Sequence, residues 1–211
     1  MDTSEGQRRI KEFCNKQFYE AVNSDQRLRI FQGGTRSGKS WSLQQYCLYL
    51  MTITKDPITI SIVRKTLPAL KRSVIRDFLH ISKNLGIYWQ GVHNRSENIF
   101  EYNGHTLEFF SADDAQKIRG SARDILWLNE GNELLFEDYR QLAMRTRGHI
   151  LIDFNPSDPI HWIYDLMDRD DADTFISTYK DNKFLPKELI NEIERIKEKD
   201  PDYWRVYGEG Q

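Results

Sequence analysis

Apolar residues recur along this chain with two different periods, and the two periods alternate. Short runs rich in apolar and β-branched residues predict strands at residues 28–32, 58–64, 124–130, 149–156 and 174–179. Apolar positions three or four residues apart predict helices at residues 6–24, 41–52, 66–86, 135–147, 160–168 and 186–199. This alternation is typical of an α/β fold with a mostly parallel sheet and helices on both faces.

Turn and cap residues sharpen two of these elements. Residues 97–112 form two alternating runs around Asn103-Gly104, a pair that predicts a tight β-hairpin. The helix at 66–86 has Thr66 as a candidate N-cap and Gly86 at its end. The pattern therefore predicts one hairpin among alternating strands and helices.

A glycine-rich stretch, GGTRSGKS at residues 33–40, joins the first predicted strand to the next helix. It has the form G-x-x-x-x-G-K-[ST], in which successive backbone N–H groups can face phosphate oxygens. Lys39 can reach the β- and γ-phosphates, and the Ser40 hydroxyl can ligate Mg²⁺. The alternative is an ordinary Gly/Ser turn. The predicted nucleotide-binding residues are Gln32, Gly33, Gly34, Thr35, Arg36, Ser37, Gly38, Lys39 and Ser40.

Polar residues end two later strands, at the edge where open parallel sheets bind ligands. Glu130 is the candidate to activate the attacking water, although a carboxylate there can also simply begin the next helix. Asn129 stands where an Asp usually supports Mg²⁺, and its uncharged amide predicts weaker metal support. Asn155 is a candidate γ-phosphate sensor, or only part of an Asn-Pro turn.

Arginines near these motifs matter because phosphoryl transfer spreads negative charge that a guanidinium can neutralise. The candidates are Arg36, Arg119, Arg145 and Arg147. Each of them also has the simpler interpretation of a surface or salt-bridged arginine.

Composition sets the class of protein. A chain of 211 residues, 39% hydrophobic and 29% charged, supports one sizeable core with a small appendage. Cys14 and Cys47 lie in apolar helical patterns and are expected to be buried thiols in a reducing compartment. No apolar run approaches a membrane span, and Met1 precedes polar residues rather than a signal peptide. We expect a soluble, cytoplasmic protein.

The net charge of −2 is unevenly distributed. Residues 27–83 hold eleven Lys or Arg against two Asp or Glu, whereas residues 158–202 hold seven against thirteen. One interpretation is a polyanion-facing side and a contrasting acidic side. The other is a set of solvated helix faces whose charges are neutralised in the fold.

The order of motifs resembles the ATPase domain of the large terminase subunit, the DNA-packaging motor of tailed bacteriophages. The resemblance runs through nearly the whole chain, and its later motifs are much more particular than the phosphate loop. The segments that carry it are GGTRSGKSW (33–41), IVRKTLPALKRSV (62–74), KIRGSARDILWLNEGNEL (117–134), FNPSDPIHWIY (154–164), TYKDNKFLP (178–186) and PDYWRVYGEG (201–210).

The resemblance implies a P-loop NTPase of the RecA-like, catalytic-Glu class, with an additional strand between the phosphate-loop strand and the catalytic-Glu strand. Residues 1–170 would form the ATPase core with its N-terminal helix, and residues 171–211 a lid subdomain or linker. ATP hydrolysis with Mg²⁺ would drive double-stranded DNA into a procapsid in the cytoplasm of the infected host. The protein would not be part of the mature virion. The implied partners are DNA, the portal of the procapsid, the small terminase subunit and further copies in a ring.

Carried over residue by residue, the resemblance gives Lys39 and Ser40 to nucleotide and metal, Glu130 to catalysis and Asn155 to coupling. Arg119 best fits an arginine that acts across the subunit boundary in some relatives, with Arg36 as an in-subunit alternative. Asn129 departs from the family, where an acidic residue is usual. The family's nuclease domain would begin near Gln211, so we expect no nuclease activity from these residues. A ring is expected only on an assembled procapsid, so we expect a monomer in solution.

Two other function classes fit a phosphate loop. A small-molecule kinase usually has an arginine-rich lid, and the acidic region at 158–202 counts against it. A non-hydrolysing nucleotide-binding module is encouraged by Asn129. A helicase-like ATPase outside packaging is a further alternative, and turnover with and without DNA separates these classes.

Overall fold

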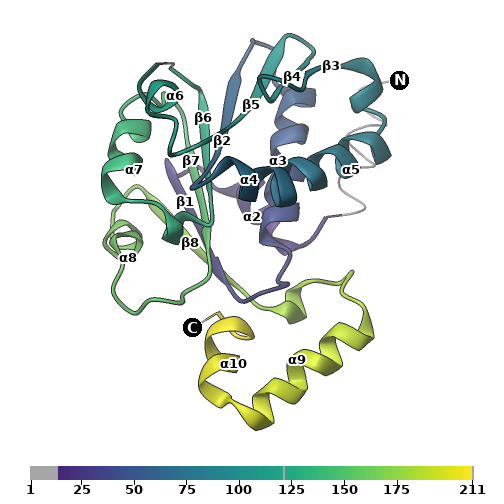
Figure 1. Ribbon diagram of the computed structural model, residues 1–211, viewed down its shortest axis with the longest axis vertical. Helices are drawn as coiled ribbons and strands as arrows, with labels where there is room; N and C mark the ends of the chain where they lie inside the picture. The colour runs from purple at the N-terminus through teal and green to yellow at the C-terminus, as the bar shows by residue number, and fades with distance from the viewer. Residues whose placement is uncertain (1–13, 121, 211) are drawn as a thin grey trace.

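The computed structural model describes residues 14–120 and 122–210. Its centre is an eight-stranded sheet in the order β3-β4-β5-β2-β6-β7-β1-β8 (Figure 1). The hairpin strands β3, β4 and β5 pair antiparallel, and all other neighbours pair parallel. The strands are β1 (Leu28–Gly33), β2 (Thr59–Arg64), β3 (Val92–Asn94), β4 (Ile99–Tyr102), β5 (His105–Ser111), β6 (Ile125–Asn129), β7 (Ile150–Phe154) and β8 (Ala172–Ser177).

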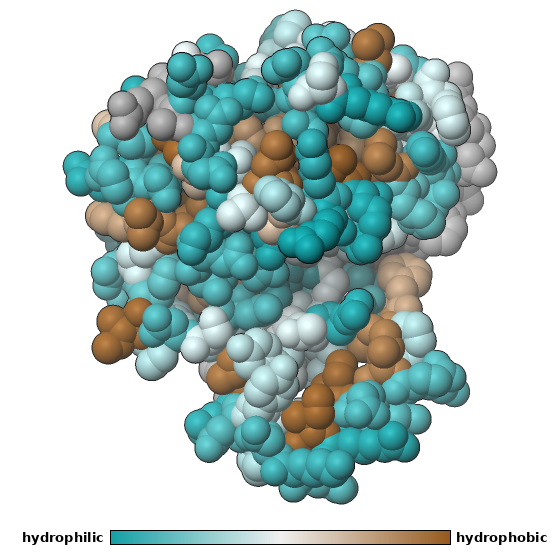
Figure 2. Space-filling model, viewed as in Figure 1, coloured by the Kyte–Doolittle hydropathy of each residue, from teal (hydrophilic) through white to brown (hydrophobic). Residues whose placement is uncertain are grey.

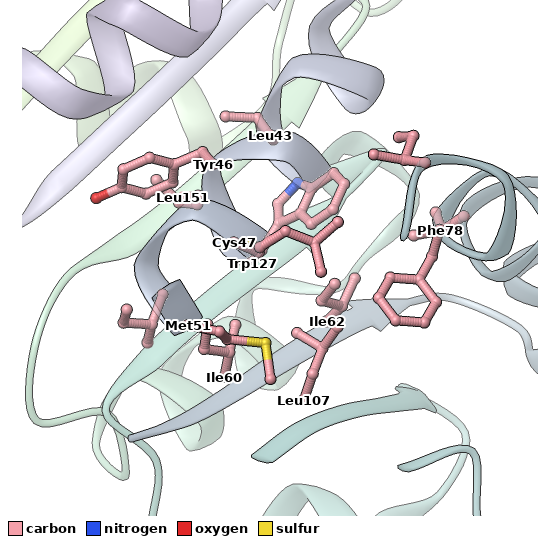
Figure 3. Packing of buried hydrophobic residues seen from close by; sticks show 14 of the residues in the cluster. Leu43, Tyr46, Cys47, Met51, Ile60, Ile62, Phe78, Leu107, Trp127 and Leu151 are labelled. Carbon is pink, nitrogen blue, oxygen red and sulfur yellow. The ribbon is translucent and has the colours of Figure 1, made fainter. Parts of the chain in front are cut away.

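Helices cover both faces of the sheet and bury one apolar cluster on each. One cluster joins α2, α3 and α5 to the sheet, and Figure 3 shows Leu43 and Met51 of α3 packed toward Ile62 and Trp127. The other joins α6, α7 and α8 to the opposite face. The helices are α2 (Lys16–Asn23), α3 (Lys39–Ile53), α4 (Leu67–Leu70), α5 (Arg76–Asn84), α6 (Ala115–Gly120), α7 (Phe136–Ala143), α8 (Trp162–Met167), α9 (Lys187–Lys199) and α10 (Pro201–Tyr207).

The predicted fold class is confirmed, including the additional strand. β7 lies between the phosphate-loop strand β1 and the Glu130-bearing strand β6. The hairpin is confirmed as well, because Asn103 and Gly104 both have positive φ, at 52° and 79°, as a tight primed turn requires. Cys14 and Cys47 are both buried, as expected.

The single helix predicted at 66–86 is instead interrupted. A π-helical segment, η1 (Lys71–Ile75), separates α4 from α5. The Ser73 hydroxyl donates to the Ala69 carbonyl and accepts from Arg64 Nη1, and such a side-chain insertion widens a helical turn. β3, α6 and α10 were not predicted, and residues 6–13 of the first predicted helix lie outside the described residues.

The C-terminal boundary also needs a correction. β8 begins at Ala172 and pairs along its whole length with β1, so the sheet extends past the expected boundary at residue 171. Only after Ser177 does the chain leave the sheet to form a lobe of α9 and α10, drawn in yellow in Figure 1. In the described part of the chain, no helix has the length and apolar character needed to cross a membrane.

Candidate nucleotide-binding site

The phosphate loop occupies the turn between β1 and α3 and has the backbone that its glycines predict. β1 ends at Gly33 and α3 begins at Lys39, so the loop stands directly on the N-terminus of a helix of 15 residues. Gly38 has a φ of 90° and Arg36 a φ of 66°, so the chain turns sharply twice within three residues. This curled backbone with a helix N-terminus behind it is a general anion-binding arrangement.

The Lys39 ammonium lies inside the loop. Its Nζ donates to the carbonyls of Gly33 at 2.8 Å and Gly34 at 3.2 Å, and to Asn155 Oδ1 at 3.0 Å. The residue is only 6% exposed. Burial lowers the pKa of this ammonium, and the nearby carboxylates of Asp153 and Glu130 oppose that shift. The charge is therefore held at the centre of the loop, in contact with the end of β7.

Side chains from distant parts of the sequence hold the loop from outside. Asn182 Nδ2, in the loop before α9, donates to the Arg36 carbonyl at 2.9 Å, and Gln17 Nε2 of α2 donates to the Ser37 carbonyl at 3.0 Å. Asn15 Nδ2 donates to Asn182 Oδ1 at 3.2 Å and closes the ring of contacts. Asn182 is the asparagine of the TYKDN motif, and its amide links the segment before α9 to the phosphate loop. This contact gives that residue of the motif a structural role.

The turn after α10 packs directly on the phosphate loop. Thr35 N donates to the Tyr207 carbonyl at 2.7 Å, and Gln32 Nε2 donates to the Gly210 carbonyl at 2.7 Å. A Cβ on Gly34 would lie 2.4 Å from the Tyr207 carbonyl oxygen, and one on Gly210 would lie 2.5 Å from Gly33 Cα. Two backbones approach so closely here that both need glycine.

Gly210→Ala is expected to detach this turn and speed hydrogen exchange of the Thr35 amide by roughly tenfold or more, because left-handed alanine alone costs about 1–2 kcal/mol. Gly104→Ala is the matched control. Gly104 has a similar φ of 79°, but a Cβ there meets nothing within 4 Å. Exchange measured by NMR should rise at Thr35 in the first variant only. Unchanged exchange in Gly210→Ala would contradict the packing argument.

Glu130 stands at the end of β6 in an unusual backbone conformation. Its φ of 53° places it in the left-handed region, where a non-glycine residue costs free energy and often marks a functional site. Burial raises the pKa of its carboxyl to about 7, helped by Asp153, while Lys39 and Arg64 act in the opposite direction. A carboxylate poised near neutral pH is suited to accept a proton.

Arg64, at the end of β2, is a neighbour of this site that the sequence did not single out. Its guanidinium pairs with Glu133, with Nε 3.4 Å from Oε2, and donates to Ser73 at 2.8 Å. The sequence could have indicated Arg64 because it ends a buried strand, and the carboxyl ends of parallel strands gather at the side of the sheet where ligands bind.

Asp153 is the most consequential residue that the sequence analysis missed. It lies on β7, opposite Asn129 in the strand register. Its carboxylate accepts from Ser40 Oγ at 2.9 Å and from Asn129 Nδ2 at 3.1 and 3.2 Å. The sequence did carry a signal for this residue, because Asp153 is a charged residue inside the apolar run ILIDF. Aspartate is rarely buried in such a strand unless its carboxylate has a partner.

The predicted arginines do not all converge on this edge. Arg36 lies in the loop itself, and its side chain is exposed. Arg119 belongs to α6, and its side chain lies outside what the structure describes. Arg147 pairs with Asp124 at 3.0 Å, and Arg145 donates to the Gln141 carbonyl at 3.0 Å. The structure therefore brings Lys39, Ser40, Asn129, Glu130 and Asn155 together and leaves the choice of arginine as a prediction.

A cavity of about 860 Å³ opens beside the phosphate loop. Its walls come from the loop, from α5 and from the C-terminal lobe, whose Phe184 and Leu189 are partly exposed. Figure 2 shows apolar surface on this lobe as well as on the main body. A pocket with an apolar wall, a cationic loop and convergent polar groups fits a nucleotide. The residues at its polar end are Lys39, Ser40, Glu130 and Asn155.

The donor set also fits Mg²⁺. Within the described residues no group of three or more His, Cys, Asp or Glu side chains could hold a metal by itself. Magnesium, however, is usually bound through one or two carboxylates or hydroxyls together with substrate phosphates. The Ser40 hydroxyl, the Asp153 carboxylate and the buried, unpartnered Asn129 Oδ1 supply hard oxygen atoms of that kind.

Comparison with known proteins identifies relatives of this chain. The family model described as phage terminase large subunit matches residues 25–211. The PBSX phage terminase large subunit of Bacillus subtilis (strain 168) is 24% identical over 233 residues, covering 96% of this chain and 53% of that protein. The chain thus spans about half the length of this curated relative.

Solved structures share the fold. The large terminase from a thermophilic bacteriophage superposes with a TM-score of 0.79 at 21% identity, covering 94% of this chain and 53% of that one. The large terminase ATPase domain of Thermus phage P74-26 superposes with a TM-score of 0.70 at 15% identity, covering 92% of each chain.

Proposed function

Because this chain belongs to the phage terminase large subunit family, we propose that it is the ATP-hydrolysing domain of a DNA-packaging motor. ATP hydrolysis in this domain powers the movement of double-stranded DNA into a procapsid. The thermophilic-phage terminase that shares its fold has been solved in complex with ADP and with ATP-gamma-S, which supports nucleotide binding by this chain.

One observation carries the proposal: Glu130 and Lys39 line one cavity, where the carboxyl ends of β1 and β6 meet on either side of β7. Lys39 and the loop amides hold the ATP phosphates, and Ser40 contributes to the Mg²⁺ site. When bound with ATP, Mg²⁺ neutralises charge that develops on the β- and γ-phosphate oxygens. Glu130 orients the attacking water and accepts its proton.

Asn155 couples nucleotide state to the lobe in this proposal. Its amide oxygen accepts from Lys39 Nζ at 3.0 Å, so a phosphate that draws Lys39 toward itself also alters the Asn155 contact. The lobe joins the same loop through Asn182 and the Tyr207 carbonyl. We therefore assign the part of the chain after Ser177 as a lid that senses the phosphate loop.

An arginine completes the site. We propose Arg119 of one subunit acting on the ATP of its neighbour, with Arg36 as the in-subunit alternative. This arrangement requires a ring, which forms on the portal of the procapsid together with the small terminase subunit. The domain is a monomer in solution, and it works in the cytoplasm of the infected bacterium.

The test is steady-state phosphate release from ATP at low salt with Mg²⁺, with and without double-stranded DNA. We expect phosphate release that DNA stimulates and that added salt suppresses, since phosphate contacts make DNA binding strongly salt-dependent. Transfer of the phosphoryl group to a small acceptor would favour a kinase. ATP binding without any release, even with DNA, would favour a regulatory module. Release that is indifferent to DNA at low salt would contradict the packaging role.

A further inference from the structure

Asp153 is buried near the carboxyl end of β7, an inner strand of the sheet, and its carboxylate accepts a hydrogen bond from the phosphate-loop serine, Ser40. It is 1% exposed. Oδ2 accepts from Ser40 Oγ at 2.9 Å, and Oδ1 accepts from Trp127 Nε1 at 2.7 Å. The Asn129 amide bridges both oxygens at 3.1 and 3.2 Å. Within the described residues, each side chain that donates a hydrogen bond to this carboxylate is neutral.

Such a group is costly without a compensating charge. Burying an ionised carboxylate is unfavourable, and hydrogen bonds, an ion pair or a metal can offset that cost. The hydrogen bonds from Ser40, Trp127 and Asn129 satisfy the oxygens of Asp153 but supply no positive charge. Among the residues that the structure describes, no basic nitrogen forms an ion pair with Asp153. Lys39 acts on it only through space. The carboxylate therefore faces the loop with charge that a divalent cation can balance.

In P-loop enzymes the metal is held by the loop Ser or Thr and by an Asp on a neighbouring strand. That strand position here is Asn129, whose amide cannot supply the charge. Parallel pairing of β6 and β7 places Asp153 directly opposite Asn129, so the missing carboxylate stands one strand further along. Ser40 Oγ also accepts from Asn129 Nδ2 at 3.2 Å, which ties the three side chains into one cluster.

We propose that Asp153 is the metal-supporting carboxylate of this ATPase, moved from β6 to β7. Asn129 is then a neutral positioning residue, whose amide holds Asp153 against Ser40. The proposal rests on the proposed ATPase function, because it concerns Mg²⁺ that accompanies the nucleotide. It differs from a purely structural role, in which Asp153 would serve only to satisfy the Trp127 indole.

The decisive experiment measures Mn²⁺ affinity in the presence of ADP, from the electron paramagnetic resonance signal of free Mn²⁺. Three proteins are compared: wild type, Asp153→Asn, and the exchange Asn129→Asp with Asp153→Asn. Nucleotide affinity in EDTA and thermal unfolding are measured on each. Asn keeps an oxygen for the Trp127 bond, so Asp153→Asn tests charge rather than packing. The exchange keeps the composition and returns the carboxylate to β6.

We expect Asp153→Asn to weaken Mn²⁺ binding by about 10- to 100-fold, with ADP affinity in EDTA unchanged. The exchange variant should recover most of the metal affinity. Unchanged Mn²⁺ affinity in a folded Asp153→Asn protein overturns the proposal. So does an exchange variant that folds and binds ADP but recovers no metal affinity. If wild type binds no nucleotide at all, the ATPase assignment itself fails, and the two failures are thus distinguishable.

Discussion

Glu130→Gln is expected to reduce the rate constant of ATP hydrolysis by roughly 10²- to 10⁴-fold, the usual contribution of a general base. Glutamine has the same shape, so it fills the same place at the end of β6. It lacks the charge that orients water and cannot accept a proton. ATP affinity should remain within a few-fold of wild type, because the phosphates are held by the loop. Single-turnover phosphate release and nucleotide titration measure the two effects separately.

Glu133→Gln is the matched control for this prediction. Glu133 lies three residues further on, and its carboxylate pairs with Arg64 at 3.4 Å, whereas Glu130 lines the cavity beside the phosphate loop. Its side chain is 38% exposed, so its ion pair contributes little. A small effect of Glu133→Gln beside a large effect of Glu130→Gln supports the assignment. Equal losses in the two variants, or full activity in Glu130→Gln, would contradict it.

Lys39→Ala is expected to weaken ATP binding by roughly 10- to 100-fold, since a hydrogen bond to a charged group contributes about 1.5–3 kcal/mol. Lys39 is the buried cation of the loop, whereas the Arg36 side chain is exposed. On ATP binding, we expect phosphate oxygens to replace the Gly33 and Gly34 carbonyls as its acceptors. Hydrolysis should fall further than binding, because charge on the phosphates grows in the transition state.

Titration calorimetry with ATP provides the measurement. Lys65→Ala is the control. Lys65 follows β2 and is exposed, and its replacement removes the same charge from the molecule. A drop in affinity common to both variants would indicate only a loss of overall electrostatic attraction. Undiminished ATP affinity in Lys39→Ala would refute the phosphate-loop assignment.

Local patterns determined much of this protein. The spacing of Gly33, Gly38 and Lys39 predicts the phosphate loop because the loop's geometry is set by consecutive backbone torsions. The apolar runs predict β6 and β7 because strands buried on both faces need near-continuous apolar residues. The strand–loop–helix order then places Lys39 and Ser40 at the sheet edge, where strand ends also bring Glu130.

Longer-range features depended on the tertiary structure. The sequence shows Asn129 without its expected charge and Asp153 24 residues later, but only the pairing of β6 with β7 sets them side by side. The same holds for the contact between Gly210 and Gly33, which joins the C-terminal end of the described chain to the phosphate loop. Register and packing are non-local: a shift of one residue would turn Asp153 to the other face of the sheet. The sequence by itself therefore determined which loop is predicted to bind phosphate, and the tertiary structure decided which carboxylate stands beside it.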